Sequence, residues 1–296
     1  MTLIQTVFTN RLIIQVSDRR LTKGMPNSKS ILIDDENYTK GICWNGTFTA
    51  GFTGISRVDR RGKKLTAHWI AEVLSDCPTF EHGVTALHQE AGKRIKKLPK
   101  NWDRRLAIVI AGFDHRREPL VASILNFDIA TGVSQDPHNF ECLRVPMRPG
   151  HDFGTYIAGA QLDDFQLRLL KRYVPRMLRQ ENGVNRAARM MVKIQRLVAE
   201  QNRTVGKDAL CVYIPKVQAT SPGQSLVMSN LGGPDIPTGT TSFGFFDKNG
   251  WQFEQRGPIS AQQGFVQEFW ASADPDNPDY QSVSTRFLKV PSSWQK

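Results

Sequence analysis

The chain has 296 residues, of which 40% are hydrophobic and 23% are charged. This length and composition allow one large core, or one domain with an extension, and they argue against a globally disordered chain. Lysine and arginine outnumber aspartate and glutamate by 39 to 28, which gives a formal net charge of +11. Such a charge suits nucleic acid, acidic surfaces or acidic partner proteins, and it says nothing about the fold.

Patterns typical of metal sites, cofactor sites and membrane segments are missing from the sequence. The four cysteines lie far apart without a Cys-x-x-Cys pair, and the six histidines show no metal-ligand spacing. Neither a P-loop nor a Gly-x-Gly-x-x-Gly element after a strand is present, so no cofactor and no metal are expected. The start has no apolar leader, and no apolar run reaches the roughly 20 residues that span a bilayer. The expected location is therefore the cytoplasm, with no membrane contact.

The first fifty residues alternate short β-type runs with tight turns. Two such runs flank the polar turn Asn10-Arg11, which predicts an N-terminal hairpin. A second hairpin is centred on Asn45-Gly46, because Asn-Gly suits a two-residue turn with positive φ. Between the hairpins, an apolar segment starts a further strand. The strands predicted here are 2–9, 12–16, 31–33, 41–44 and 47–50.

Helices and strands then follow in blocks. Apolar residues at helical spacing predict one pair of helices over 65–98, with Pro78 between them, and a second pair over 162–198. The other strands are expected at 106–110, 120–127, 140–145, 156–158 and 209–214.

The resulting order is strands, two helices, strands, two helices and a strand. A βαβ alternation is absent, which excludes a doubly wound parallel sheet. We expect an α+β fold: a four-layer αββα sandwich of two antiparallel sheets with a helix pair on each outer face. Residues 1–216 would form this core. Residues 217–296 are rich in proline, glycine and serine and would form a C-terminal extension, either packed on the core or a mobile arm.

Several short motifs in this order resemble a known family. Thr2 is followed by Val16-Ser-Asp18-Arg-Arg20-Leu-Thr22, and Gly51-Phe-Thr-Gly54 precedes Asp59. Over about residues 2–216 the chain is similar to proteasome β subunits and to the related peptidase subunit of a bacterial ATP-dependent protease. The resemblance implies an αββα sandwich of the N-terminal-nucleophile hydrolase type and assembly into a homo-oligomer. The further motifs that carry it are Ile110-Ala-Gly112-Phe-Asp114, Glu118-Pro119-Leu120, Phe127-Asp128 and Ala158-Gly159-Ala160.

By this resemblance four residues carry the chemistry. Removal of the initiator methionine would make Thr2 the first residue; its Oγ would attack a carbonyl carbon and its α-amino group would accept the proton. Asp18 would hold a nearby lysine in place, and Lys29, just ahead of the strand at 31–33, is the expected lysine. A cation there lowers the proton affinity of the amine and favours ionisation of the hydroxyl. The N–H of Gly54 would stabilise the oxyanion. The substrate would be a peptide or another amide.

The sequence departs from the family at three polar positions. The family carries an aspartate and a serine shortly before the glycine that matches Gly206, and here the residues are Asn202 and Val205. It also carries a serine in the element that matches Ala158-Gly159-Ala160, where none is present. Because these groups orient the nucleophile, a catalytically inactive oligomeric scaffold remains an alternative.

The basic character of the chain leaves a third alternative, a protein associated with nucleic acid. The densest basic runs lie within 57–64 and 93–105. Such runs are usually solvated faces, and aromatic side chains other than Trp102 are not interleaved with them. Nucleic acid is therefore the least expected of the partners.

Overall fold

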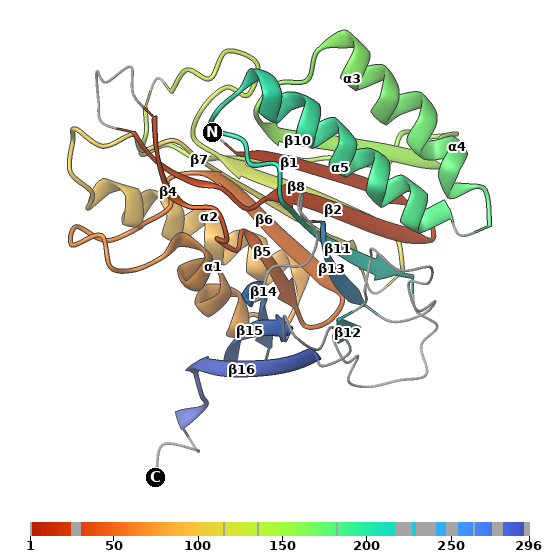
Figure 1. Ribbon diagram of the computed structural model, residues 1–296. Coiled ribbons are helices and arrows are strands. Elements are labelled where there is room, and N and C mark those ends of the chain that lie inside the picture. Colours follow the sequence, from red (N-terminus) through yellow and green to blue (C-terminus); the bar gives the residue numbers. More distant parts are fainter. Residues whose placement is uncertain are drawn as a thin grey trace.

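The computed structural model of the chain shows a mixed α and β protein (Figure 1). Its strands form two large sheets, in which most pairs are antiparallel, and one small two-stranded sheet. The residues that the structure describes are 2–24, 31–114, 116–134, 136–181, 183–216, 227–228, 241–246, 254–262, 264–273 and 281–292.

The six-stranded sheet contains the N-terminal hairpin. Its strands are β1 (Leu3–Thr9), β2 (Leu12–Asp18), β10 (Phe153–Gly159), β11 (Ala209–Pro215), β12 (Val227–Met228) and β13 (Ser242–Phe246). They lie in the order β10-β1-β2-β11-β13-β12. The predicted pairing of β1 with β2 is confirmed, with Ile4 opposite Ser17. The start of β1 therefore lies beside the end of β2, where Asp18 is located.

The eight-stranded sheet contains the second predicted hairpin. Its strands are β5 (Gly41–Trp44), β6 (Phe48–Gly54), β7 (Leu106–Phe113), β8 (Pro119–Leu125), β9 (Glu141–Arg144), β14 (Glu254–Gln262), β15 (Phe265–Ala273) and β16 (Gln281–Lys289). They lie in the order β16-β15-β14-β5-β6-β7-β8-β9. Asn45 and Gly46 join β5 to β6 with φ of 51° and 64°, as the Asn-Gly turn predicted.

Two groups of helices lie on opposite sides of the sheets (Figure 1). The first group is α1 (Thr66–Ser75) and α2 (Phe80–Lys96); the second is α3 (Asp164–Arg168), η1 (Leu169–Tyr173), α4 (Val174–Leu178) and α5 (Gly183–Gln201). Both predicted helix pairs are therefore present. The first member of the second pair contains a π-helical turn. Pro175 has no N–H to bond the Lys171 carbonyl, so the turn widens and the Val174 N–H bonds to the Leu169 carbonyl.

Three apolar clusters connect these elements. One joins α1 and α2 to the eight-stranded sheet, through residues such as Trp69, Leu87 and Ile108. A second joins α5 and the turns before it to the six-stranded sheet, with Met191 packed near Val16. A third lies between the two sheets, and a separate small cluster around Leu3 and Val205 closes one end of β1. Burial of this much apolar surface is the main favourable contribution to folding.

The segment before β5 differs from the expectation. The residues predicted to start a strand at 31–33 form β4 (Ile31–Asp35), but this strand pairs only with β3 (Leu21–Gly24) in the two-stranded sheet. Leu32 and Ile33 are 57% and 51% exposed, so their apolar character does not reflect core packing. The two-stranded sheet of β3 and β4 thus lies between β2 and β5 in the chain.

The described parts of 217–296 contribute strands to both sheets. β13 pairs with β11, and β14 pairs in parallel with β5 at the edge of the predicted core. Aromatic, strand-like runs occur in the sequence at 242–246 and 251–253; the first is β13, and the second lies outside the described residues. The boundary predicted at residue 216 stays a prediction. Within the described ranges, every helix is too short or too polar to reach across a bilayer.

Candidate functional site

A buried cluster forms at the start of β1, where both large sheets end. The Nζ of Lys40 lies 2.6 Å from Oγ1 of Thr2 and 2.9 Å from Oδ1 of Asp18. Thr2 is 6% exposed, and the side chains of Lys40 and Asp18 are 2% and 0% exposed. Lys40 therefore links the hydroxyl of Thr2 to a buried carboxylate through two hydrogen bonds.

Asp18 is held by four donors. In addition to Lys40, its carboxylate accepts hydrogen bonds from the backbone N–H groups of Leu3 at 2.8 Å, Arg20 at 3.0 Å and Gly206 at 3.3 Å. These donors come from β1, from the residues after β2, and from the loop before β11. A carboxylate with this many donors is fixed in position, and so is the lysine bonded to it.

Lys40 is surrounded by acceptors but shielded from water. Burial lowers its pKa below the ordinary value of 10.5, and the charge of Asp18 opposes this shift without overcoming it. The Nζ also donates to the Arg20 carbonyl, so its three hydrogen bonds go to Thr2, Asp18 and Arg20. An ammonium with a lowered pKa gives up or shares a proton more readily than a solvated one, and here that proton points at a hydroxyl.

The backbone of Thr2 is fixed from two sides. Oγ1 of Thr53, at the end of β6, lies 3.1 Å from the Thr2 nitrogen and 3.2 Å from the Thr2 carbonyl oxygen. The Ala160 N–H donates to the same carbonyl at 2.9 Å. Thr2 therefore contacts the eight-stranded sheet through Thr53 and the end of β10 through Ala160.

Gly159 makes the close approach of Thr2 possible, and Gly54 allows a similar approach of β6 to Arg105. Gly159 has φ of +94°, and a Cβ there would lie 1.7 Å from the Thr2 carbonyl oxygen. Gly54 has φ of +105°, and a Cβ there would lie 2.0 Å from the Arg105 carbonyl oxygen. Any side chain at these positions would be both strained and overlapped by backbone. The glycine predicted at 54 thus follows Thr53 directly and ends the strand beside Thr2.

Three of the four predicted residues lie together. Thr2 and Asp18 are joined by Lys40, and Gly54 is the neighbour of Thr53. Lys29 lies outside the described residues, and Lys40, which the sequence reasoning missed, is the lysine in contact with Thr2. The strand predicted after Lys29 is β4, which pairs with β3 in the two-stranded sheet. The available signal was a lysine directly before β5, a strand whose four residues are all buried.

Asn202 and Val205, two of the departures noted in the sequence, have structural contacts of their own. Val205 is fully buried in the apolar cluster with Leu3. Asn202 accepts hydrogen bonds from the backbone and hydroxyl of Thr204, so its side chain caps a local turn. In the described part of the chain, the side-chain polar contacts of Thr2 come from Lys40 and Thr53.

A cavity of about 350 Å³ lies close to the same end of the sheets. Its lining includes Arg105, whose carbonyl accepts a hydrogen bond from the Ile55 N–H, two residues after Thr53. Thr2 does not line this cavity. The basic run at 93–105 supplies several of its walls, and within it Arg105 forms an ion pair with Asp103 at 2.6 Å. The charge of Arg105 is therefore locally neutralised.

Neither a protein-family model nor a curated protein sequence matches this chain. Among the described residues, no group of three or more His, Cys, Asp or Glu side chains could hold a metal ion. The groups that the described residues bring together at the site are a hydroxyl, a buried lysine, a carboxylate and nearby backbone N–H groups.

Proposed function

We propose that the protein is an N-terminal threonine hydrolase that cleaves peptide or other amide bonds, with Thr2 as the nucleophile. The proposal includes the fold: helix group, sheet, sheet and helix group would correspond to the four-layer sandwich of proteasome-like N-terminal-nucleophile hydrolases. The observation that supports it best is the 2.6 Å contact between Lys40 Nζ and Thr2 Oγ1, backed by Asp18.

The proposed reaction uses both polar groups of one residue. Removal of Met1 turns the Thr2 nitrogen into a free amine, which titrates near pH 8, roughly, and is partly neutral at neutral pH. Oγ1 attacks the carbonyl carbon of the substrate while its proton passes to this amine. The leaving amine then takes the proton, and water hydrolyses the resulting ester to regenerate Thr2.

Lys40 replaces Lys29 in this mechanism. Its Nζ donates to Oγ1, so it stabilises the negative charge that develops on the oxygen as the proton leaves. Asp18 keeps the ammonium in place and partly compensates the cost of burying it. The Gly54 N–H is the proposed oxyanion donor, by the family resemblance and by its place next to Thr53. Removal of one such donor typically costs about 10²–10³ in rate.

The test combines mass and covalent labelling. The intact mass of purified protein should correspond to a chain starting at Thr2, and a β-lactone probe that acylates threonine hydroxyls should add one label. Thr2→Ala should lose the label, whereas Thr2→Ser should keep it because a hydroxyl remains. Retained Met1 in native material, or equal labelling of Thr2→Ala, would overturn the proposal. The inactive-scaffold alternative predicts a large homo-oligomer by light scattering with no label on Thr2.

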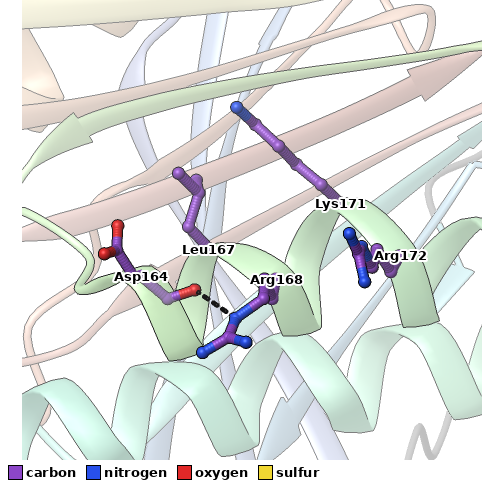
Figure 2. Close-up of a pocket in the computed structure, with 5 residues that line it drawn as sticks. All are labelled: Asp164, Leu167, Arg168, Lys171 and Arg172. Atoms are coloured by element: carbon purple, nitrogen blue, oxygen red, sulfur yellow. Dashed lines mark hydrogen bonds between the residues drawn. The ribbon is translucent and has the colours of Figure 1, made fainter.

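A second candidate function is binding of single-stranded nucleic acid, and one surface favours it. Arg168, Lys171, Arg172 and Arg176 project from the helix over 164–178, and we call these four residues the helical basic surface. Figure 2 shows the first three beside Asp164, along a cavity of about 490 Å³. Within the described residues, no acidic side chain forms an ion pair with Lys171, Arg172 or Arg176.

This surface also exposes aromatic rings. Phe165 and Tyr173 are 55% and 46% exposed and line an adjoining cavity of about 220 Å³ together with Arg168, Arg172 and Arg176. Cations for the phosphates and rings for the bases are the features of grooves that bind single strands. A third cavity of about 410 Å³ shares Lys171 and adds Arg148 and His151.

A further inference from the structure

Thr53 makes a contact that the proposed mechanism leaves unused. Its side chain is fully buried at the end of β6, which belongs to the eight-stranded sheet, whereas Thr2 precedes β1 of the six-stranded sheet. The contact therefore crosses from one sheet to the other, between residues that are 51 positions apart. Within the described part of the chain, Thr53 is the residue whose side chain forms a hydrogen bond with the Thr2 nitrogen.

The direction of the two hydrogen bonds follows from proton counting. The Thr53 hydroxyl has one proton, which it donates to the Thr2 carbonyl oxygen at 3.2 Å. Its oxygen then presents a lone pair to the Thr2 nitrogen, 3.1 Å away, and accepts an N–H from it. The Thr2 carbonyl is fixed in turn by the Ala160 N–H, so the hydroxyl of Thr53 is held in one orientation.

The end of β10 has no hydroxyl that could do the same. Its residues Ala158, Gly159 and Ala160 are apolar, and a Cβ on Gly159 would lie 1.7 Å from the Thr2 carbonyl oxygen and 2.9 Å from Thr53 Oγ1. A serine at position 159 would thus collide with the two groups that it would have to serve. The facing strand β6 is left to supply the group.

We propose that Thr53 is a positioning residue for the α-amino group of Thr2, an inference that rests on the proposed hydrolase function. After Met1 is removed, one N–H of the amine bonds to Thr53, which turns the nitrogen lone pair toward Oγ1. The proton that leaves Oγ1 then moves to this nitrogen, and the ammonium that forms keeps its bond to Thr53. A hydrogen bond to the charged form is stronger than one to the neutral form, so Thr53 raises the pKa of the amine.

The experiment compares three variants by the rate of β-lactone labelling as a function of pH. Thr53→Val keeps the shape and removes the hydroxyl, and it should lower the maximal rate about tenfold and move the acid limb of the profile to lower pH. Thr53→Ser keeps the hydroxyl and should stay within about threefold of wild type. Thr49→Val is the matched control, because Thr49 is a buried threonine on the same strand whose hydroxyl bonds to Gln15 instead.

The outcomes separate the two proposals. If wild type with a processed N-terminus takes no label, the hydrolase function fails and the role of Thr53 with it. If wild type is labelled but Thr53→Val has the same maximal rate and pH midpoint, only the role of Thr53 is overturned. A shift of equal size in Thr49→Val would also overturn it, since any buried threonine on β6 would then have the same effect.

Circular dichroism and intact mass check that each variant is folded and has lost Met1; Thr53→Ala replaces Thr53→Val if the latter does not fold.

Discussion

The site around Thr2 and the helical basic surface carry their charges in opposite ways. Lys40 and Asp18 are almost completely buried, 2.9 Å apart, and the carboxylate accepts hydrogen bonds from three backbone N–H groups as well. On the helical basic surface, cations such as Lys171 and Arg172 have no acidic partner in the described part of the chain and line open cavities. The charges of the Thr2 site are desolvated, whereas the charges of the helical basic surface remain in contact with water.

This difference determines which measurement reports on each region. Buried pairs are screened little by salt, and loss of one partner leaves the other buried and uncompensated. Exposed cations contribute little to stability, but their attraction for an anion falls steeply with salt. Substitutions at the Thr2 site should therefore change unfolding and labelling, whereas substitutions on the helical basic surface should change only salt-dependent binding.

The largest effect on stability is expected for Asp18→Ala. This change leaves Lys40 as an unpaired buried cation and removes the acceptor of three backbone N–H groups. The free energy of unfolding should fall by about 3–5 kcal/mol, measured by urea denaturation. Asp103→Ala is the control, because its ion pair with Arg105 is exposed and should be worth about 0–1 kcal/mol. Equal losses in both variants would contradict the contrast between buried and exposed charge.

Lys40→Met should destabilise somewhat less, by about 3 kcal/mol, because Asp18 keeps its backbone donors. It should also abolish labelling of Thr2, if Lys40 stabilises the charge on Oγ1.

The pH dependence of this variant tests the lowered pKa of Lys40. Between the pKa in the folded state and the ordinary value of 10.5, the unfolded chain binds a proton that the folded chain does not. In that pH window the Lys40 side chain therefore makes the free energy of unfolding of wild type rise with pH. Lys40→Met lacks this contribution. The difference in free energy of unfolding between the two proteins should be larger at pH 9.5 than at pH 7.5. Comparison of the two proteins cancels the opposite contribution of Cys43 and Cys211, whose thiol pKa values burial raises. If the difference in free energy of unfolding between the two proteins became smaller as pH rises, that result would contradict the lowered pKa of Lys40.

A smaller effect is the expected difference in stability between Gly159→Ala and its control, Gly150→Ala. At this position a Cβ would overlap the Thr2 carbonyl, whereas at Gly150, which also has positive φ, it would meet nothing within 4 Å. Both variants carry the backbone strain of an alanine in the left-handed region, about 1–2 kcal/mol. Gly159→Ala should lose about 1–3 kcal/mol more by displacing β1, and it should slow labelling, whereas Gly150→Ala should label normally. Thermal unfolding and the labelling rate of both variants measure the difference, and identical behaviour would show that Thr2 does not need the close approach.

Local patterns in the sequence were enough to predict most of the elements. The Asn45-Gly46 turn specifies its own hairpin, and helical spacing of apolar residues marks α1, α2 and α5, because these signals depend on neighbours in the chain. Thr2 and Asp18 could be matched for a similar reason, since a single short hairpin fixes the distance between them.

The remaining parts of the site depend on contacts between distant segments. Lys40 was missed because β3 and β4 precede it in the chain, and exposed apolar residues in β4 have the pattern of a core strand. Thr53 could not be singled out because its hydroxyl meets Thr2 only when two sheets pack together, and no local pattern encodes that contact. The π-helical turn before Pro175 was not predicted either, because the spacing of apolar residues does not show that the Val174 N–H bonds to the Leu169 carbonyl.

The smallest effect on stability, and the largest on salt dependence, is expected from Lys171→Ala combined with Arg172→Ala. Both side chains are unpaired among the described residues, so unfolding should change by no more than about 0.5 kcal/mol. If the helical basic surface binds single strands, the slope of log affinity against log salt should fall by about 0.7 for each cation lost. Fluorescence anisotropy with a labelled single-stranded oligonucleotide between 50 and 200 mM salt, roughly, measures this slope.

Lys93→Ala is the matched control for that experiment. The Lys93 side chain is 66% exposed and pairs with Glu90 at 3.0 Å. The substitution therefore removes one surface cation whose charge is already neutralised. An equal fall in slope per cation removed would mean that the whole basic surface of the chain attracts the strand without a site. Tyr173→Ala adds the second criterion, because loss of a stacked base should weaken binding at every salt concentration without changing the slope. If polyglutamate of matched charge binds as tightly as the oligonucleotide and Tyr173→Ala has no effect, the surface selects negative charge alone. That result would contradict the nucleic-acid proposal and would favour an acidic protein as the partner.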